Sequence, residues 1–359
     1  MNNTKECTLG MELEVKGLYA EIASNNESLE TLENHIKGFP IDKLYDGKID
    51  LTLDMRSPNN TRTKSDKVSA DIEYVFNHIY FPTNELHCND WNHVTTLLKT
   101  NIEDIKNNND NKYRSITNGS KIYNFSIKYL NFKKEDPDLM IHLTCAYPLC
   151  NIFNENMRKS IMGDDYGYLE DYMSAVQNDY VLNIGTYSEY ERNSCLNFIA
   201  LLWSITNAAE TNPDISPDPK QKINIMNRTA LGSMYLNCLN NNSCNFIHFF
   251  LEKVLSKDCN SNIKTRLDFH LTKDVTNKDL INYILDISNE EDDPLIKTTE
   301  KIGISQLKDK FENGMPIFEI RDCGSIPLSK LSIYMQKVCE MINKRNELVA
   351  NFHVSIINQ

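Results

Sequence analysis

Near the beginning of the chain lies the stretch Leu9-Gly10-Met11-Glu12-Leu13-Glu14-Val15, which decides the fold. Glu12 and Glu14 alternate with apolar residues, and on a β-strand this period of two places both carboxylates on one face. Glutamate is depleted in strands, so two aligned glutamates within one strand need a reason. Carboxylate oxygens suit Mg²⁺. The segment therefore predicts either an amphipathic surface strand or one wall of a divalent-cation site.

Acidic side chains recur on four further segments that alternate like strands. They are Asp54 in residues 48–54, Asp71 and Glu73 in residues 69–76, Asp268 in residues 265–271, and Glu319 in residues 316–322. If all these strands share one sheet, their acids converge on a polar floor. Such a floor is electrostatically costly unless cations neutralise it. Two or three Mg²⁺ ions that bridge the phosphates of a nucleotide would supply that charge.

The rest of the chain predicts helices around a mainly antiparallel sheet. Apolar spacing indicates helices at about 28–37 and 91–105, a mainly helical region from 155 to 260, and a terminal helix at about 328–350. A central strand is expected at residues 139–147, where Pro148 stops it. We therefore expect an α+β fold with helices on one side of the sheet. The whole chain, residues 1–359, is expected to form a single domain with a large helical insertion at about 155–260.

Composition excludes several classes of protein. The 359 residues carry a net charge of −12, which argues against a general nucleic-acid or anionic-membrane binder. No signal peptide is recognisable, and the longest apolar stretch, residues 198–203, is far too short to span a bilayer. Ten cysteines without a CxxC pair fit a reducing compartment. We expect a cytoplasmic protein, while delivery to another cell as an effector or toxin, by a specialised secretion system, stays open.

Taken in order, these motifs resemble the amidoligases of the glutamate–cysteine ligase and glutamine synthetase superfamily. The matching stretches are Gly10-Met11-Glu12-Leu13-Glu14, the acid-bearing strand 48–54, Asp71-Ile72-Glu73-Tyr74-Val75, His142-Leu143-Thr144, Phe318-Glu319-Ile320-Arg321 and Gly324-Ser325. The family often has His-x-His on the central strand, and here Thr144 replaces the second histidine. The resemblance covers most of the chain and implies a glutamine-synthetase-like sheet and a carboxylate–amine ligase.

The resemblance implies that ATP phosphorylates a substrate carboxylate and that an amine attacks the resulting acyl phosphate. By it, Glu12, Glu14, Glu73 and Glu319 would bind Mg²⁺ or Mn²⁺, and Glu73 and Arg321 would belong to the catalytic set. Arg321 would hold phosphate or the transferred group, and His142 or Thr144 would line the nucleotide or metal site. Arg228 has no family counterpart, and its charge alone assigns it to phosphate or a substrate carboxylate. The acceptor would be an amino acid, a peptide or a protein side chain.

Two other classes stay open at the level of sequence. A cysteine-dependent hydrolase or deamidase would use Cys145 or Cys323 as nucleophile with His142 or His270 as base, although no nucleophile motif surrounds either cysteine. A non-catalytic binding protein would leave the acidic strands facing solvent and would bind no nucleotide.

Overall fold

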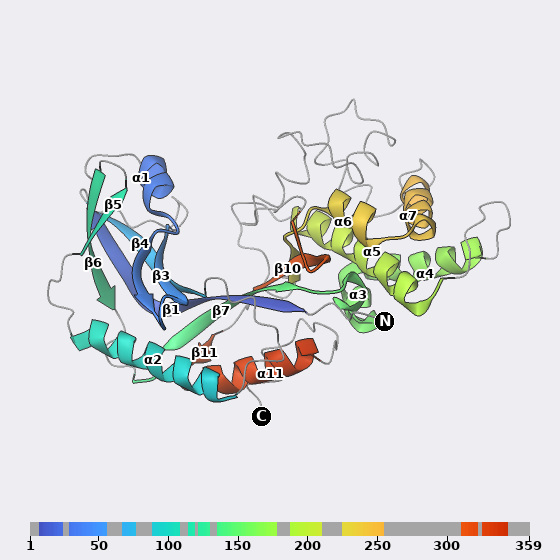
Figure 1. Ribbon diagram of the computed structural model, residues 1–359. Helices are drawn as coiled ribbons and strands as arrows, with labels where there is room; N and C mark the ends of the chain where they lie inside the picture. Colours follow the sequence, from blue (N-terminus) through green and yellow to red (C-terminus); the bar gives the residue numbers. More distant parts are fainter. Residues whose placement is uncertain are drawn as a thin grey trace. The chain divides into compact units, whose positions relative to one another are not determined.

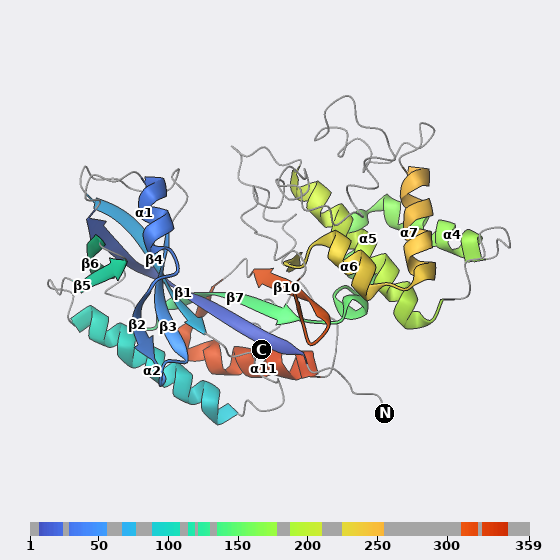
Figure 2. The same cartoon turned by 45° about the horizontal axis from the view of Figure 1, so that its top comes forward.

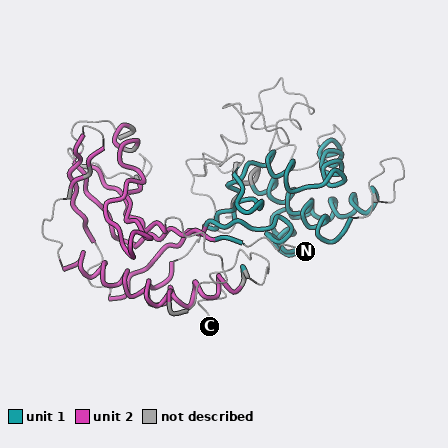
Figure 3. Tube along the Cα trace, viewed as in Figure 1, with its two compact units in different colours: residues 1–8, 144–323, 341–352 teal, residues 9–143, 324–340, 353–359 magenta. Residues whose placement is uncertain are grey.

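The structure, a computed structural model, describes the following residues: 7–23, 29–55, 67–76, 88–107, 114–118, 121–129, 135–177, 187–209, 225–254, 310–321 and 325–343. The chain divides into two compact units, which Figure 3 colours separately. Unit 1 comprises residues 1–8, 144–323 and 341–352, and unit 2 comprises residues 9–143, 324–340 and 353–359. Helices and antiparallel strands are mixed in the chain, so the expected α+β class is confirmed.

A sheet forms the centre of unit 2 (Figure 1). Its strands are β1 (Thr8–Ala23), β2 (Pro40–Leu44), β3 (Ile49–Met55), β4 (Lys67–Phe76), β5 (Arg114–Asn118), β6 (Lys121–Tyr129), β7 (Asp138–Ala146) and β11 (Ile326–Pro327). The order along the sheet is β2-β3-β4-β1-β7, while β6 pairs with β1 and β5, and β11 pairs with β7. The strand β1 is therefore central, with neighbours on both sides.

The strand β1 follows the alternation of its sequence and then continues past it. Leu9, Met11 and Leu13 are buried, while Glu12 and Glu14 lie half-buried on the opposite face. The pairing with β4 shifts between Glu14 and Tyr19, which marks a bulge. Gly17 lies within it at φ 88°, in the left-handed region that favours glycine. The bulge lets the strand continue to Ala23, beyond the end that the sequence pattern indicates.

The apolar side of this sheet is covered by α2 (Cys88–Asn107) and by α11 (Leu331–Asn343), which follows the 3₁₀ turn η4 (Leu328–Lys330). Tyr74 of β4 donates a hydrogen bond of 2.9 Å from its hydroxyl to Asn101 of α2. Ser332 Oγ and Asn92 Oδ1 are 2.7 Å apart, which joins α11 to α2. Figure 2 shows these helices and the short helix α1 (Leu29–Ile36) from a second direction.

Unit 1 combines a small set of strands with a group of helices. Its strands are β8 (Ile225–Asn227), β9 (Phe311–Glu312) and β10 (Met315–Arg321), and β10 pairs with both of the others. Its helical elements are η2 (Leu149–Asn151), α3 (Glu155–Met162), α4 (Asp164–Gln177), α5 (Glu189–Ala209), α6 (Leu231–Cys238) and α7 (Asn241–Val254). The helices pack around buried aromatic rings, among them Trp203, Phe246 and Phe250.

The strands expected at 9–16, 48–54, 69–76, 139–147 and 316–322 are confirmed, as are the helices at 28–37 and 91–105. The terminal helix is confirmed as η4 and α11 up to residue 343, and α3 to α7 lie in the region expected to be helical. The acid-bearing segment 265–271 lies outside the described residues. The single ligase-like domain over residues 1–359 stays a prediction. Among the described helices, none has the length and apolarity that crossing a bilayer requires.

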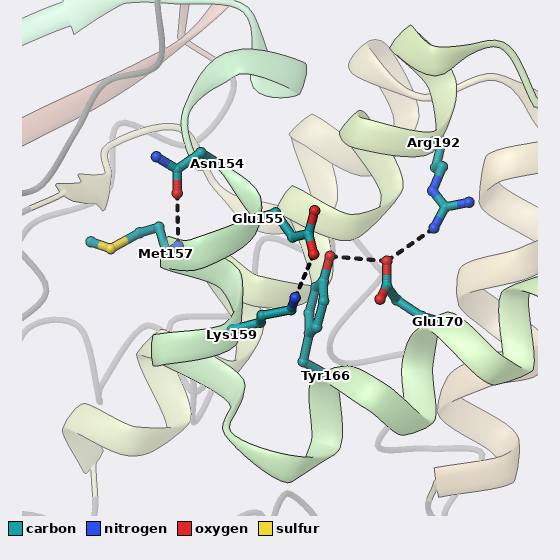
Figure 4. A network of polar contacts seen from close by, with 7 residues as sticks. All are labelled: Asn154, Glu155, Met157, Lys159, Tyr166, Glu170 and Arg192. Atoms are coloured by element: carbon teal, nitrogen blue, oxygen red, sulfur yellow. Dashed lines mark hydrogen bonds and ion pairs between the residues drawn. The ribbon is translucent and has the colours of Figure 1, made fainter.

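Polar contacts fix the entry of α3 and join α4 to α5 (Figure 4). Asn154 caps α3 by accepting a hydrogen bond of 2.8 Å from the Met157 backbone N–H. Tyr166 of α4 donates to Glu170, which also pairs with Arg192 of α5 at 3.0 Å. The Glu170–Arg192 pair therefore joins α4 to α5, while the Asn154 cap lies within the entry of α3 itself.

Loss of the α3 cap is expected to destabilise the protein slightly. An Asn154→Ala variant leaves the Met157 N–H without its side-chain acceptor, and lost N-caps cost about 0.5–2 kcal/mol. Urea unfolding would measure the loss, and Asn154→Ser, which retains an acceptor, should recover most of it. Equal losses in both variants would contradict the capping role.

Candidate functional site: a carboxylate face in unit 2 and an ion pair in unit 1

Three acid-bearing strands place their carboxylates on one face of the unit 2 sheet. Glu14 of β1 stands directly opposite Glu73 of β4, and Asp71 of β4 stands directly opposite Asp54 of β3. Directly opposed residues share a face and lie close together. Glu12 is two residues before Glu14 on the same strand, so it faces the same way. The expectation that these acids converge is confirmed for β1, β3 and β4. We call this surface the carboxylate face.

Glu73 shows the electrostatic consequence most clearly. Burial raises its pKa from 4.5 to about 9, with further increases from the charges of Asp54, Glu12 and Glu14 and from a hydrogen bond with Glu14. A carboxyl group with this pKa holds its proton at neutral pH. Burial and the crowding of acids on the carboxylate face therefore keep Glu73 neutral when no cation is bound.

His142 of β7 reaches the same face. Its Nδ1 lies 3.9 Å from Glu14 Oε1, and both side chains are partly buried. Thr144 is two residues further along the strand and has the same orientation by alternation, but it belongs to unit 1. The structure places His142 beside Glu14 of the acidic strand, and its role at a nucleotide or metal site stays a prediction.

The oxygen donors of this face are of the chemical type that binds divalent cations. Carboxylate oxygens are the ligands that Mg²⁺ and Mn²⁺ accept, and a positive charge would relieve the repulsion that raises the pKa of Glu73. No group of three or more His, Cys, Asp or Glu side chains in the described part of the chain is already arranged to hold a metal ion. Cation binding would therefore require side-chain rotation on a fixed sheet.

Unit 1 holds Glu319 and Arg228 together as an ion pair. Arg228 Nη1 lies 3.1 Å from Glu319 Oε2, and the glutamate side chain is only 6% exposed. The pairing of β8 with β10 brings the two together, because Asn227, next to Arg228, stands opposite Phe318. Sequence analysis assigns Glu319 to metal binding and Arg228 to phosphate or a substrate carboxylate, and it does not predict the pair. The strand β8 has only three residues, so its sequence shows no alternation from which its pairing with β10 could be predicted.

Thr229 attaches the Arg228 segment to β10. Its fully buried hydroxyl accepts a hydrogen bond of 2.8 Å from the Ile317 N–H and donates one of 2.7 Å to the Lys310 carbonyl oxygen. The Arg228 N–H donates to the Ile317 carbonyl oxygen at 2.8 Å. These contacts hold the backbone of Arg228 against the strand that carries Glu319.

The remaining predicted site residues are only partly described. Arg321 ends β10, and its side chain lies outside the described residues. Asp268, His270 and Cys323 also lie outside them. Glu319, Arg228 and Arg321 belong to unit 1, so the meeting of all five acidic segments on one floor stays a prediction.

The cysteine-hydrolase alternative loses one of its two candidate nucleophiles. Cys145 is 1% exposed, and burial, together with the nearby Cys7, raises the pKa of its thiol well above the ordinary value. It also stands three residues from His142 on one strand, so the two side chains face opposite sides. A buried thiol that resists ionisation is a poor nucleophile. None of the described cysteines forms a disulfide.

Comparisons with known proteins add little. No protein-family model matches the chain, and no curated protein matches its sequence. One similar solved structure is a point mutant of a VgrG Vibrio cholerae toxin ACD domain in complex with ADP and Mn²⁺. It is 14% identical, with a TM-score of 0.44, over 91% of this chain and 96% of that chain.

A second similar structure is a Vibrio cholerae toxin from the MARTX/VgrG family. It is also 14% identical, with a TM-score of 0.44, over 89% of this chain and 94% of that chain. A likeness this distant carries no argument about the fold or the activity of this chain.

Proposed function

We propose that the chain is an ATP- and Mg²⁺-dependent carboxylate–amine ligase, with Mn²⁺ as an alternative cation, and that it forms an amide or isopeptide bond. ATP supplies the γ-phosphoryl group that converts a substrate carboxylate to an acyl phosphate, with release of ADP. Attack by an amine then forms the C–N bond, expels phosphate and releases a proton. We further propose that the sheet is glutamine-synthetase-like and that residues 1–359 act as one ligase domain with a helical insertion at about 155–260.

The observation that carries this proposal is the crowding on the carboxylate face. Burial, and then the charges of Asp54, Glu12 and Glu14 around it, raise the pKa of Glu73 to about 9. Placing five acids on one face costs stability unless cations neutralise their charge. Phosphoryl transfer needs such a face, because cations held by carboxylates neutralise the phosphate oxygens.

The proposed roles divide between the two units. In unit 2, Glu12, Glu14 and Glu73 hold the cation, and His142 lines the nucleotide site. In unit 1, Glu319 is proposed as a cation ligand, and to bind a cation it would have to give up its contact with Arg228. Thr144 lines the nucleotide site, and Arg228 and Arg321 hold phosphate or the group transferred, as guanidinium groups commonly do. Arg321, Arg228 and Glu73 form the proposed catalytic set.

The substrates are proposed only by class, as a carboxylate and an amine acceptor on an amino acid, a peptide or a protein side chain. The net charge of −12 disfavours nucleic acid or an anionic membrane as partner. A cytoplasmic site of action, whether in the producing cell or in a cell that receives the protein as an effector or toxin, fits this chemistry because ATP and Mg²⁺ are abundant there.

Binding of Mg-ATP should raise the thermal unfolding midpoint of the full chain. A ligand at 100 times its Kd stabilises the folded state by about 2.7 kcal/mol. Differential scanning fluorimetry with ATP and Mg²⁺, with ATP and EDTA, and with Mg²⁺ alone would measure the shift. We expect the largest shift with both components and its loss in Glu12→Gln.

Glu21→Gln is the matched control, because Glu21 lies on the same strand beyond the bulge and does not contribute to the raised pKa of Glu73. The control should keep the full shift. Absence of any shift in the wild-type protein at millimolar ATP and Mg²⁺ would contradict the ligase and favour a non-catalytic binding protein.

A further inference from the structure

A basic residue lies on the same sheet face as the carboxylates, beyond the β1 bulge. Lys128 of β6 stands directly opposite Tyr19 of β1, Tyr19 stands opposite Asp71 of β4, and Asp71 stands opposite Asp54 of β3. These four residues form one row across four neighbouring strands, so their side chains share a face. The adjacent row contains Glu14 and Glu73. The lysine row therefore borders the carboxylate row.

The separation of the two rows suits a polyphosphate. Neighbouring strands lie about 4.8 Å apart and residues along a strand about 3.3 Å apart. Two strands across and two residues along place the Cα atoms of Lys128 and Glu73 about 12 Å apart. The two side chains extend into the space above the sheet from these positions. A phosphate group that contacts a cation on the carboxylates would then lie within reach of the lysine.

Lys128 also differs from three other lysines of unit 2, whose ammonium groups have partners within the protein. Lys37 pairs with Asp54 at 3.2 Å, Lys16 donates to Ser325 Oγ at 2.9 Å, and Lys106 lies over the ring of Tyr129. Lys128 is half-buried and makes no ion pair within the described residues. Because no described carboxylate pairs with it, the Lys128 ammonium group can donate charge-assisted hydrogen bonds to an anion.

We infer that Lys128 is a phosphate-binding residue of the proposed nucleotide site and contacts the polyphosphate of the nucleotide at the end away from the carboxylate-bound cation. The inference rests on the proposed function, because it requires a nucleotide at this face. A charged ammonium donates strong hydrogen bonds to phosphate oxygens. Lys128 thus supplies positive charge from unit 2 itself, where the sequence motifs identify only acids and a histidine.

Isothermal titration of the full chain with Mg-ATP, and separately with inorganic triphosphate and Mg²⁺, tests the inference. Lys128→Gln should weaken both ligands by about 10- to 100-fold, the usual effect of losing a charged hydrogen bond. Lys128→Arg should retain most of the affinity. Lys121 lies on the same strand, but alternation places its side chain on the opposite face, so Lys121→Gln should bind both ligands like the wild type. Unliganded unfolding midpoints of the variants would show that each one is folded.

The possible results separate the two claims. If the wild type binds Mg-ATP and Lys128→Gln binds each ligand as tightly as the wild type does, the assignment of Lys128 is wrong and the proposed function stands. If Lys128→Gln weakens ATP but not triphosphate, the lysine does not contact phosphate, and the inference is again overturned. If the wild type binds neither ligand, the proposed function fails and the inference fails with it.

Discussion

The Glu73→Gln variant is expected to be more stable than the wild-type protein at pH 7 to 8 in the presence of EDTA, and to lose less stability as pH rises. The pKa of Glu73 is about 9 in the folded state, against an ordinary value of 4.5. Between these values the folded state binds more protons than the unfolded state, so the free energy of unfolding falls with increasing pH. Full stability is present below about pH 4.5 and is lost progressively up to about pH 9.

The size of this effect follows from linkage. One pKa unit corresponds to about 1.4 kcal/mol, so the wild type would lose about 3 kcal/mol between pH 4.5 and pH 7 if Glu73 acted alone. Glutamine cannot ionise, and it occupies nearly the same volume. Urea unfolding at pH 5, 7 and 8.5 would measure the slope, with Glu21→Gln as the matched control. Identical slopes in the wild type and Glu73→Gln would show that burial and the neighbouring acids do not hold Glu73 neutral.

Removal of the guanidinium group of Arg228 is expected to destabilise the protein by about 3 kcal/mol, because loss of one partner of a buried ion pair leaves the other charge uncompensated. Glu319 is only 6% exposed and lies 3.1 Å from Arg228. Urea unfolding of Arg228→Met would measure the loss. The double variant Arg228→Met/Glu319→Gln should recover part of it, since the buried charge is then gone.

A matched control is Arg192→Met. The Arg192–Glu170 pair has a similar distance of 3.0 Å, but its side chains are 38% and 32% exposed. Exposed pairs contribute about 0–1 kcal/mol, so this variant should lose far less stability. If both arginine variants lost a similar amount of unfolding free energy, burial of Glu319 would not determine the loss in Arg228→Met.

The strands that carry the candidate site could be predicted because their chemistry is local. In β1 the alternation of Glu12 and Glu14 with apolar residues shows both the strand and its polar face. The turn signal at Asp46-Gly47 likewise marks the start of β3, whose Asp54 stands opposite Asp71. The sequence does not show that the charge of Asp54 raises the pKa of Glu73, because their proximity depends on the register between strands.

The features that sequence analysis missed depend on pairing between distant segments. Gly17 interrupts the alternation of β1, so the extension to Ala23 could not be read from a period of two. The strand β6 begins with exposed Lys121 and Ile122 and lacks a clean alternation, so Lys128 was not recognised as a member of the sheet. The Arg228–Glu319 pair depends on a strand of three residues. Periodicity cannot identify so short a strand.

We propose above all that the carboxylate face holds a nucleotide through a divalent cation. Equilibrium dialysis of radiolabelled ATP against the full chain tests it most directly, with Mg²⁺ or Mn²⁺ and with EDTA, for the wild type and for Glu14→Gln. We predict that the wild type retains ATP only when a divalent cation is present, and that Glu14→Gln retains much less. Equal retention with and without the cation, or by both proteins, would contradict the claim.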